Sequence, residues 1–204
     1  MNKSVVSIAA TVFSVVCIVI GMELAREITK GHPGIGTKPT TVPLDFRVYS
    51  DDRGIFSIEI PSSFAVKDEQ VPAVDKLQRM GGSIRLFSIT DDQSSIFFSI
   101  TVVDLDIDLI RNGRTDDRIA SDGLQQAFYR VGGSLDRTIE VDRLGRRVWQ
   151  GLGSATQEGV SMGVVAEAYV LQRGTFLISA FSLDRNPQSN PVVNHVLTSF
   201  RIRK

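Results

Sequence analysis

An uninterrupted apolar stretch near the amino terminus constrains this chain more than any other feature of its sequence. Residues 4–22 contain no charged side chain, and ten of them are Val, Ile or Phe. As an α-helix the stretch would rise about 28 Å, close to the ~30 Å hydrocarbon thickness of a bilayer. In lipid, backbone N–H and C=O groups must be paired within the segment, so even a β-branched run becomes helical. The stretch therefore predicts a transmembrane helix in contact with the bilayer.

The flanks of this stretch favour an uncleaved signal anchor over residues 1–25. Lys3 supplies a basic start, but the apolar run is longer than the 7–15 residues typical of a cleaved signal peptide. A small-x-small cleavage site is also missing, since Glu23 lies two residues before Ala25. A cleaved signal and a buried hairpin helix are the alternatives.

Two sequence features favour opposite orientations of the span in the membrane. The short tail before the span predicts that the bulk of the chain lies on the extracytoplasmic (periplasmic or lumenal) side. Arg26 and Lys30, which follow the span, slightly favour the reverse orientation.

A change of composition after the span predicts a flexible linker at 26–42, followed by one domain at 43–204. The linker contains several Gly and Pro residues, and its length gives a root-mean-square reach of roughly 20–25 Å. The remaining length suffices for one hydrophobic core. The formal net charge of zero argues against nucleic-acid binding. Because the one cysteine, Cys17, falls inside the apolar stretch, a disulfide-stapled domain is excluded.

Alternating apolar and polar residues predict a series of strands in the domain. They span 55–60, 83–90, 95–103, 138–141, 147–154, 164–171, 176–181 and 200–203. Asp91 and Asp92 predict a turn that pairs two of these strands as an antiparallel hairpin.

Apolar residues at helical spacing predict helices at 115–133 and from Pro191 onward, with Thr115 and Asn190 as N-caps. His195 is expected on the exposed side of the second helix. The predicted fold is α+β, an antiparallel sheet flanked by two main helices.

Two short motifs resemble those of the PsbP/Mog1-like families. The first is the strand 54–61 (GIFSIEIP) followed by Phe64, and the second is the closing sequence 197–201 (LTSFR) after an amphipathic helix. Phe64 stands where these proteins often carry Trp. The resemblance implies an antiparallel sheet with flanking helices, an accessory or docking role, and no catalytic residues.

Residues 159–163 (GVSMG) match the G-x-S-x-G nucleophile motif, with Ser161 as the serine. That motif requires a strand before the serine, a helix after it, and a histidine with an acid to activate it. Here the following residues predict a strand, so we interpret Ser161 as a turn residue.

Three aspartates, Asp104, Asp106 and Asp108, alternate with apolar residues. Carboxylates on one face of a strand would suit Ca²⁺, which prefers oxygen ligands. Side chains two residues apart on a flat strand are ~6–7 Å from each other, too far to share one ion without a bend. We therefore predict no metal site and no cofactor, and keep these three as a weak Ca²⁺ candidate.

A basic cluster, Arg143, Arg146 and Arg147, lies beside the single Trp149 and is the candidate interaction site. Trp and Arg are enriched at interface hot spots, although Trp149 could equally belong to the core. The sequence thus predicts a non-enzymatic, membrane-anchored accessory subunit that docks on other subunits of a membrane complex. An extracytoplasmic module that binds lipid or a small ligand is the alternative, and a serine hydrolase is a remote third.

Overall fold

The structure, a computed structural model, describes residues 45–71, 75–91, 94–106, 108, 113–157 and 159–203. The predicted transmembrane segment (4–22) and linker (26–42) lie outside these residues. Among the described helices, none is long and apolar enough to cross a bilayer.

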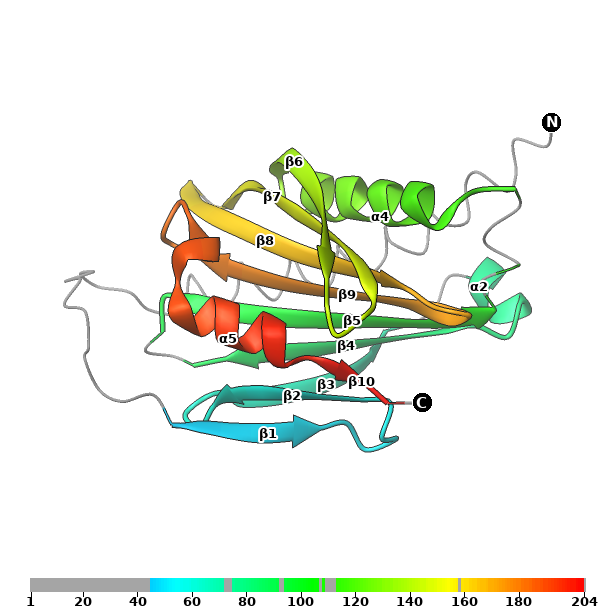
Figure 1. Cartoon of the computed structure of the whole chain (residues 1–204), viewed down its shortest axis with the longest axis horizontal. Coiled ribbons are helices and arrows are strands. Elements are labelled where there is room, and N and C mark those ends of the chain that lie inside the picture. Colours follow the sequence, from blue (N-terminus) through cyan, green and yellow to red (C-terminus); the bar gives the residue numbers. More distant parts are fainter. Residues whose placement is uncertain are drawn as a thin grey trace.

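Antiparallel strands form two sheets in the described part of the chain (Figure 1). The larger sheet has the order β3 (Ala65–Val71), β4 (Ser83–Thr90), β5 (Ile96–Asp106), β9 (Arg173–Ser182), β8 (Val160–Val170), β7 (Arg147–Gln157), β6 (Gly133–Asp142). The smaller sheet places β2 (Phe56–Pro61) between β1 (Phe46–Ser50) and β10 (Arg201–Ile202). The other described elements are α2 (Asp75–Arg79), α4 (Asp116–Arg130), the 3-10 helix η1 (Pro187–Ser189) and α5 (Pro191–Ser199).

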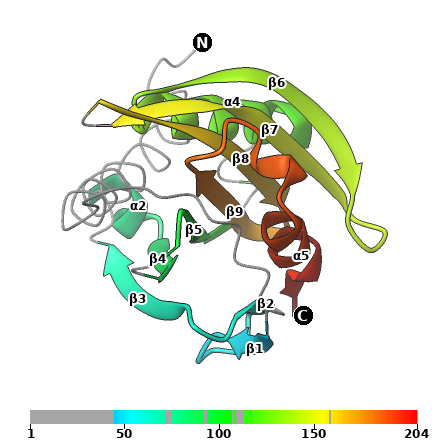
Figure 2. The same ribbon diagram turned by 90° about the vertical axis from the view of Figure 1, so that its left-hand side faces the viewer.

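The central strands of the larger sheet are buried on both faces, which explains the nearly continuous apolar runs in β5, β8 and β9. One hydrophobic core lies on the face that carries α4. The second core lies on the opposite face, beneath a layer made of the smaller sheet and α5. Figure 2 shows α4 on one side of the sheet and β1 and β2 on the other. This sheet-dominated α+β arrangement confirms the predicted fold class for the described residues.

Helix α4 forms where its apolar stripe and its cap predict it. The Thr115 hydroxyl accepts a hydrogen bond from the backbone N–H of Arg118, and Asp116 and Asp117 occupy the first turn. Phe128 projects from α4 onto β7. A Cβ at Gly153 would lie 2.8 Å from the Phe128 ring, so this strand carries glycine where the ring packs.

Helix α5 closes the second core. Its N-cap Asn190 accepts a hydrogen bond from the backbone N–H of Val192 over 2.9 Å, with Pro191 in the first turn. At the other end of α5, the Ser199 hydroxyl accepts from the Glu59 N–H of β2 over 2.9 Å. The predicted exposed side is confirmed at His195, whose Nε2 lies 2.7 Å from a Glu59 carboxylate oxygen.

A partly buried ion cluster joins the two sheets. Arg85 of β4 contacts Asp51 and Asp52 of the β1–β2 turn, over 3.3 and 2.6 Å, and also Asp68 of β3. Burial lowers the pKa of Arg85, but hydrogen bonds to Asp68 and Asp52 outweigh it and hold the pKa above its ordinary value. The cluster therefore fixes the position of the smaller sheet on the larger one.

Two elements that the sequence did not predict, β3 and α2, lie at one edge of the larger sheet. Strand β3 is mostly exposed and carries Lys67, Asp68 and Glu69, so it lacks an apolar run. Helix α2 has five residues, too few for a detectable helical period. Strand β6 also begins earlier than predicted, at Gly133, because only its second half is rich in β-formers.

Candidate interaction surface at the β6–β7 hairpin

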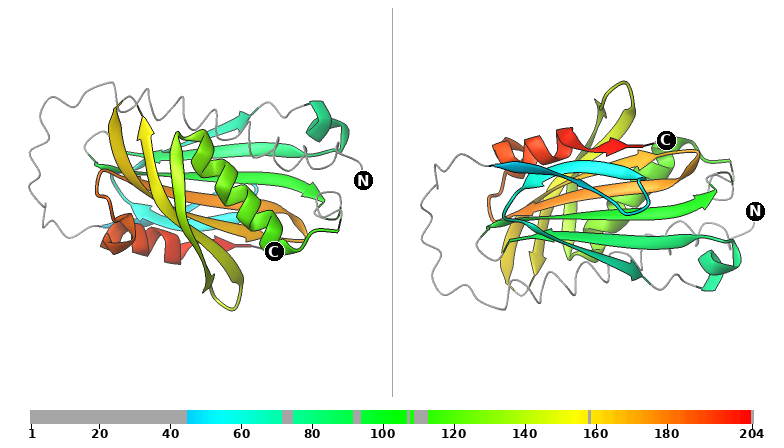
Figure 3. Two further views of the ribbon diagram at one scale, coloured as in Figure 1. Left: turned by 90° about the horizontal axis from the view of Figure 1, so that it is seen from above. Right: turned by 90° about the horizontal axis from the view of Figure 1, so that it is seen from below.

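The β6–β7 hairpin carries all four predicted interaction residues, and its tip extends past the neighbouring strands (Figure 3). Arg143 and Arg146 exchange backbone N–H···O bonds of 2.9 and 3.2 Å, so Leu144 and Gly145 form a two-residue loop. The Asp142 carboxylate accepts a further bond of 2.9 Å from the Gly145 N–H. The tip is therefore a tight, hydrogen-bonded turn.

Leu144 is the residue at this tip that the sequence analysis missed. It has a φ of 58°, and it is the one non-glycine residue with a positive φ in the described part of the chain. With Gly145 at 73°, the pair resembles a type I′ turn, in which Asn-Gly is the preferred sequence. The left-handed conformation costs a leucine roughly 1–2 kcal/mol, and its side chain is 70 % exposed. Neither burial nor backbone preference explains a leucine here.

Arg143 fastens the base of the turn to the sheet. Its guanidinium binds the Glu167 carboxylate of β8 through contacts of 2.5, 3.2 and 3.3 Å. Glu167 is fully buried and also accepts bonds from Gln150 Nε2 and the Tyr169 hydroxyl, each 2.9 Å long. Burial lowers the pKa of Arg143, but the bond to Glu167 outweighs this and raises the pKa above its usual value. The hairpin is thus held rigidly.

Arg147 and Trp149 lie on the α4 side of β7. The Arg147 guanidinium is 5.2 Å from the centre of the Trp149 ring and makes ion pairs with Asp117 of α4 and Glu140 of β6. Trp149 is 7 % exposed and belongs to the core on this face. The structure therefore places Trp149 inside the domain, with Arg147 over its ring.

The four predicted interaction residues do not share one surface. Arg143 is tied to Glu167 on one face of the sheet, while Arg147 and Trp149 pack on the other. Arg146 is half-buried and makes no ion pair with the described residues. Within the described residues, Arg146 is therefore the basic group beside Leu144 that forms no ion pair.

The weak Ca²⁺ candidate does not assemble in this structure. Among the described residues, no group of three or more His, Cys, Asp or Glu side chains is arranged to hold a metal ion. An irregularity in the β5–β9 pairing interrupts the alternation after Val103. Asp106 accepts a hydrogen bond from the Asp108 backbone N–H over 3.0 Å, forming a local turn.

Ser161 was predicted to lie in a turn, but β8 begins at Val160, so the structure places Ser161 in the strand itself. It is exposed near the start of β8, directly after the Gly159 turn, and pairs with Thr156 in the β7–β8 hairpin. A nucleophile elbow would place a helix after the serine, whereas β8 continues to Val170.

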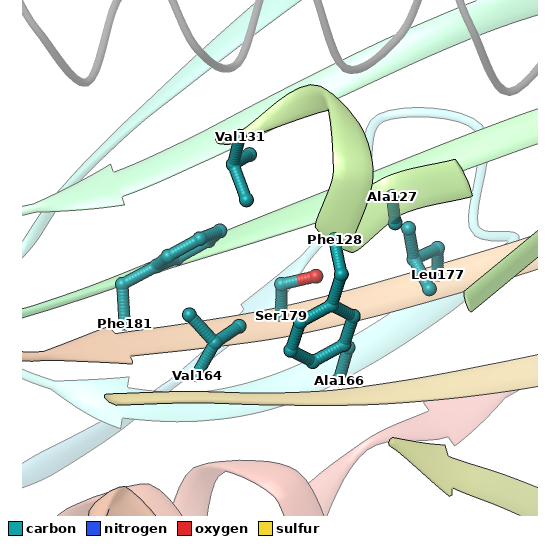
Figure 4. A pocket seen from close by; sticks show the side chains of 8 residues that line it. All are labelled: Ala127, Phe128, Val131, Val164, Ala166, Leu177, Ser179 and Phe181. Atoms are coloured by element: carbon teal, nitrogen blue, oxygen red, sulfur yellow. The ribbon is translucent and has the colours of Figure 1, made fainter. Parts of the chain in front are cut away.

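A small apolar cavity lies between α4 and the sheet (Figure 4). Its lining comes from α4, β8 and β9: Ala127, Phe128, Val131, Val164, Ala166, Leu177, Ser179 and Phe181. The volume of about 10 Å³ is at the lower limit for a single water molecule. A cavity of this size does not accommodate a lipid chain.

Several solved structures are similar to this chain. Cyanobacterial PsbP from Synechocystis sp. PCC 6803 is 14 % identical, with a TM-score of 0.52 over 83 % of this chain and 99 % of that one. A putative regulator of unknown function from Pseudomonas aeruginosa is 12 % identical, with a TM-score of 0.46 over 78 % and 98 % of the two chains. The immunity protein TplEi of the same organism, solved with the "L" peptide, is 7 % identical, with a TM-score of 0.44 over 78 % and 98 %. No family model and no curated protein matches the chain. The likeness to cyanobacterial PsbP confirms a PsbP-like fold.

Proposed function

We propose that this chain, whose domain has a PsbP-like fold, is a non-catalytic accessory subunit that docks on a membrane protein complex through its β6–β7 hairpin. In this proposal residues 4–22 anchor it as a single-pass helix, and the bulk of the chain is extracytoplasmic. The observation that carries the docking role is the exposed, left-handed Leu144 at the tip of a rigid hairpin.

The geometry of the tip suits insertion into a pocket on another protein. An apolar side chain exposed at a hairpin tip gains about 25 cal/mol for each Å² of its surface that a partner buries. Because Arg143 is fastened to Glu167, little conformational entropy is lost when the tip is fixed by a partner. Arg146, beside Leu144, favours a partner pocket with an acidic rim.

The backbone conformation allows a variant that separates stability from docking. Asn tolerates positive φ better than leucine does, so Leu144→Asn relieves strain and is expected to leave the domain equally stable or up to about 1 kcal/mol more stable. The same change removes the apolar contact at the tip. We expect native membranes solubilised in mild detergent to yield stoichiometric partners with the wild type and at least about tenfold less with Leu144→Asn.

Tyr129→Gln is the matched control, because Tyr129 is a similarly exposed apolar residue that lies on α4 away from the hairpin. It should leave partner recovery unchanged. Equal recovery with wild type and Leu144→Asn would refute docking through the tip. The absence of any stoichiometric partner for the wild type would count against the accessory role itself.

The anchor is tested separately from the docking. The full chain should stay in the membrane pellet after washes with high salt and alkaline carbonate, and its mature amino terminus should precede residue 4. A mature chain that begins after Ala25 and is released by salt alone would exclude the anchor. Protease protection in sealed vesicles reports the orientation.

A further inference from the structure

Half of the α4-side face of the larger sheet has no helix over it in the described part of the chain. Helix α4 packs on β6, β7 and β8, and no described helix packs comparably on β4 or β5 from this side. Figure 3 shows α4 crossing the sheet obliquely and α2 near the far end of β4 and β5. The face over β4, β5 and β9 nevertheless carries large apolar side chains, among them Leu86, Val103 and Leu177.

Three hydroxyl groups on this face have no hydrogen-bond partner among the described residues. They are Ser99 Oγ and Thr101 Oγ1 of β5 and Thr175 Oγ1 of β9, whose residues are 4 %, 1 % and 3 % exposed. A buried hydroxyl left without a partner costs about 1–3 kcal/mol. Strand register places Thr101 beside Leu86 and Leu177, and Thr175 beside Val103. These side chains are buried although no described helix lies over them, so the surface that faces them should be mainly apolar and carry hydroxyl groups for the three orphaned ones.

We propose that this face is the docking surface for the chain's own apolar segment, residues 4–22, packed as a helix beside α4 whenever that segment is not in a bilayer. As a helix the segment carries Ser7, Thr11 and Ser14 on one side, at the spacings i, i+4 and i+7. Those positions extend about 10 Å along a helix, and the three unpaired hydroxyls of the sheet fall in successive rows that extend about 13 Å along the strands.

The dimensions of the segment and its connection fit this surface. A helix of residues 4–22 is about 28 Å long, while β5 with its 11 residues extends about 36 Å. The connection to the first described residue, Asp45, comprises 22 residues, which reach at most about 75 Å. Because the smaller sheet and a docked helix lie on opposite faces, on the order of 20 Å apart, the connection can pass around the edge of the sheet.

Docking and membrane insertion compete for the same segment. In the bilayer the hydroxyls of Ser7, Thr11 and Ser14 can bond only to backbone carbonyls of their own helix, whereas on the sheet they would meet Ser99, Thr101 and Thr175. Insertion would in turn uncover the face. The chain would therefore be soluble before insertion, with its apolar segment protected by its own sheet.

The single native cysteine, Cys17, lies in the segment and provides the test. In the full chain, Thr101→Cys places a second thiol on the face. The matched control is Thr138→Cys on β6, an exposed threonine of the same sheet beyond α4. Both are treated with a short bismaleimide in detergent-free buffer, and intramolecular cross-links are identified by peptide mapping. We expect the Thr101→Cys product to exceed that of Thr138→Cys about tenfold or more.

Adding phosphatidylcholine vesicles before the reagent should reduce the Thr101→Cys product, because the segment then enters the bilayer. Equal cross-linking at both positions in buffer would overturn the proposal. Cross-linked dimers in place of the intramolecular product would show instead that a second copy supplies the helix, and would overturn it as well. Ser99→Cys, a near-isosteric change on the same strand, repeats the test if Thr101→Cys does not fold. The outcome is independent of the membrane-wash experiment, which tests the anchor alone.

Discussion

Removing the guanidinium of Arg143 tests the most specific energetic claim about the hairpin. Arg143→Ala leaves the Glu167 carboxylate fully buried with two neutral donors, Gln150 and Tyr169, instead of three partners. Removing one partner of a buried ion pair typically lowers the free energy of unfolding by about 3–5 kcal/mol, because the remaining charge has no counter-ion. The Arg143 side chain is 22 % exposed, so water can enter the vacated space and compensate in part. We therefore expect a loss of about 2–3 kcal/mol.

Equilibrium unfolding of the full chain in urea measures this loss, with the fluorescence of Trp149 as the signal. The same change should lower Tm by roughly 4–12 °C for a protein of this size. Glu167→Gln in the Arg143→Ala background removes the buried charge and should restore at least about 1 kcal/mol. If Arg143→Ala costs less than about 0.5 kcal/mol, or if Glu167→Gln gives no recovery, the hairpin is not held by this cluster.

Two further predictions concern the cores. Phe128→Ala removes the ring that packs on Gly153 and should lower the free energy of unfolding in urea by about 3–5 kcal/mol. The control, Tyr129→Ala, changes an exposed neighbour and should alter stability by less than about 0.5 kcal/mol. Equal effects of the two variants would mean that α4 is not packed as described. Burial, and then the nearby Glu167 carboxylate, raise the pKa of Tyr169 above its ordinary value near 10, so the folded state retains a proton that the unfolded chain loses. Stability should then fall above pH ~10 by about 1.4 kcal/mol per pH unit from this group, and an equally steep decline in Tyr169→Phe would contradict that assignment.

Helices α4 and α5 were predictable because their signals are local. Thr115 and Asn190 cap α4 and α5 through bonds to backbone groups two or three residues away, and Pro191 takes the first helical position. The apolar stripe of α4 follows from its spacing alone. Such features depend on a few consecutive residues, so the sequence reveals them.

The order of the strands depends on pairs that are far apart in the chain. Strand β5 lies beside β9, which places Ile100 opposite Ile178, and no local pattern encodes that pairing. Strand β3 was missed because an exposed edge strand tolerates charged residues throughout. The PsbP-like motifs supplied the architecture that periodicity alone could not.

The interaction residues show the same limit. The cluster of arginines beside Trp149 was visible, but their partners Glu167, Asp117 and Glu140 come from other elements. Glu167 had a detectable signal, since a carboxylate inside an apolar strand must have a partner. Leu144 in the place of Asn before Gly145 was the overlooked signal of a strained turn.

The position of β2 between the first and the last described strands has a consequence for biosynthesis. Ser57 pairs with Ser50 on one side and, on the other, with Arg201, which is synthesised much later. The second core therefore cannot close until residue 201 has left the ribosome, and its early strands remain open until then. A nascent chain of this kind depends on rapid release or on chaperones, because unpaired strand edges aggregate readily.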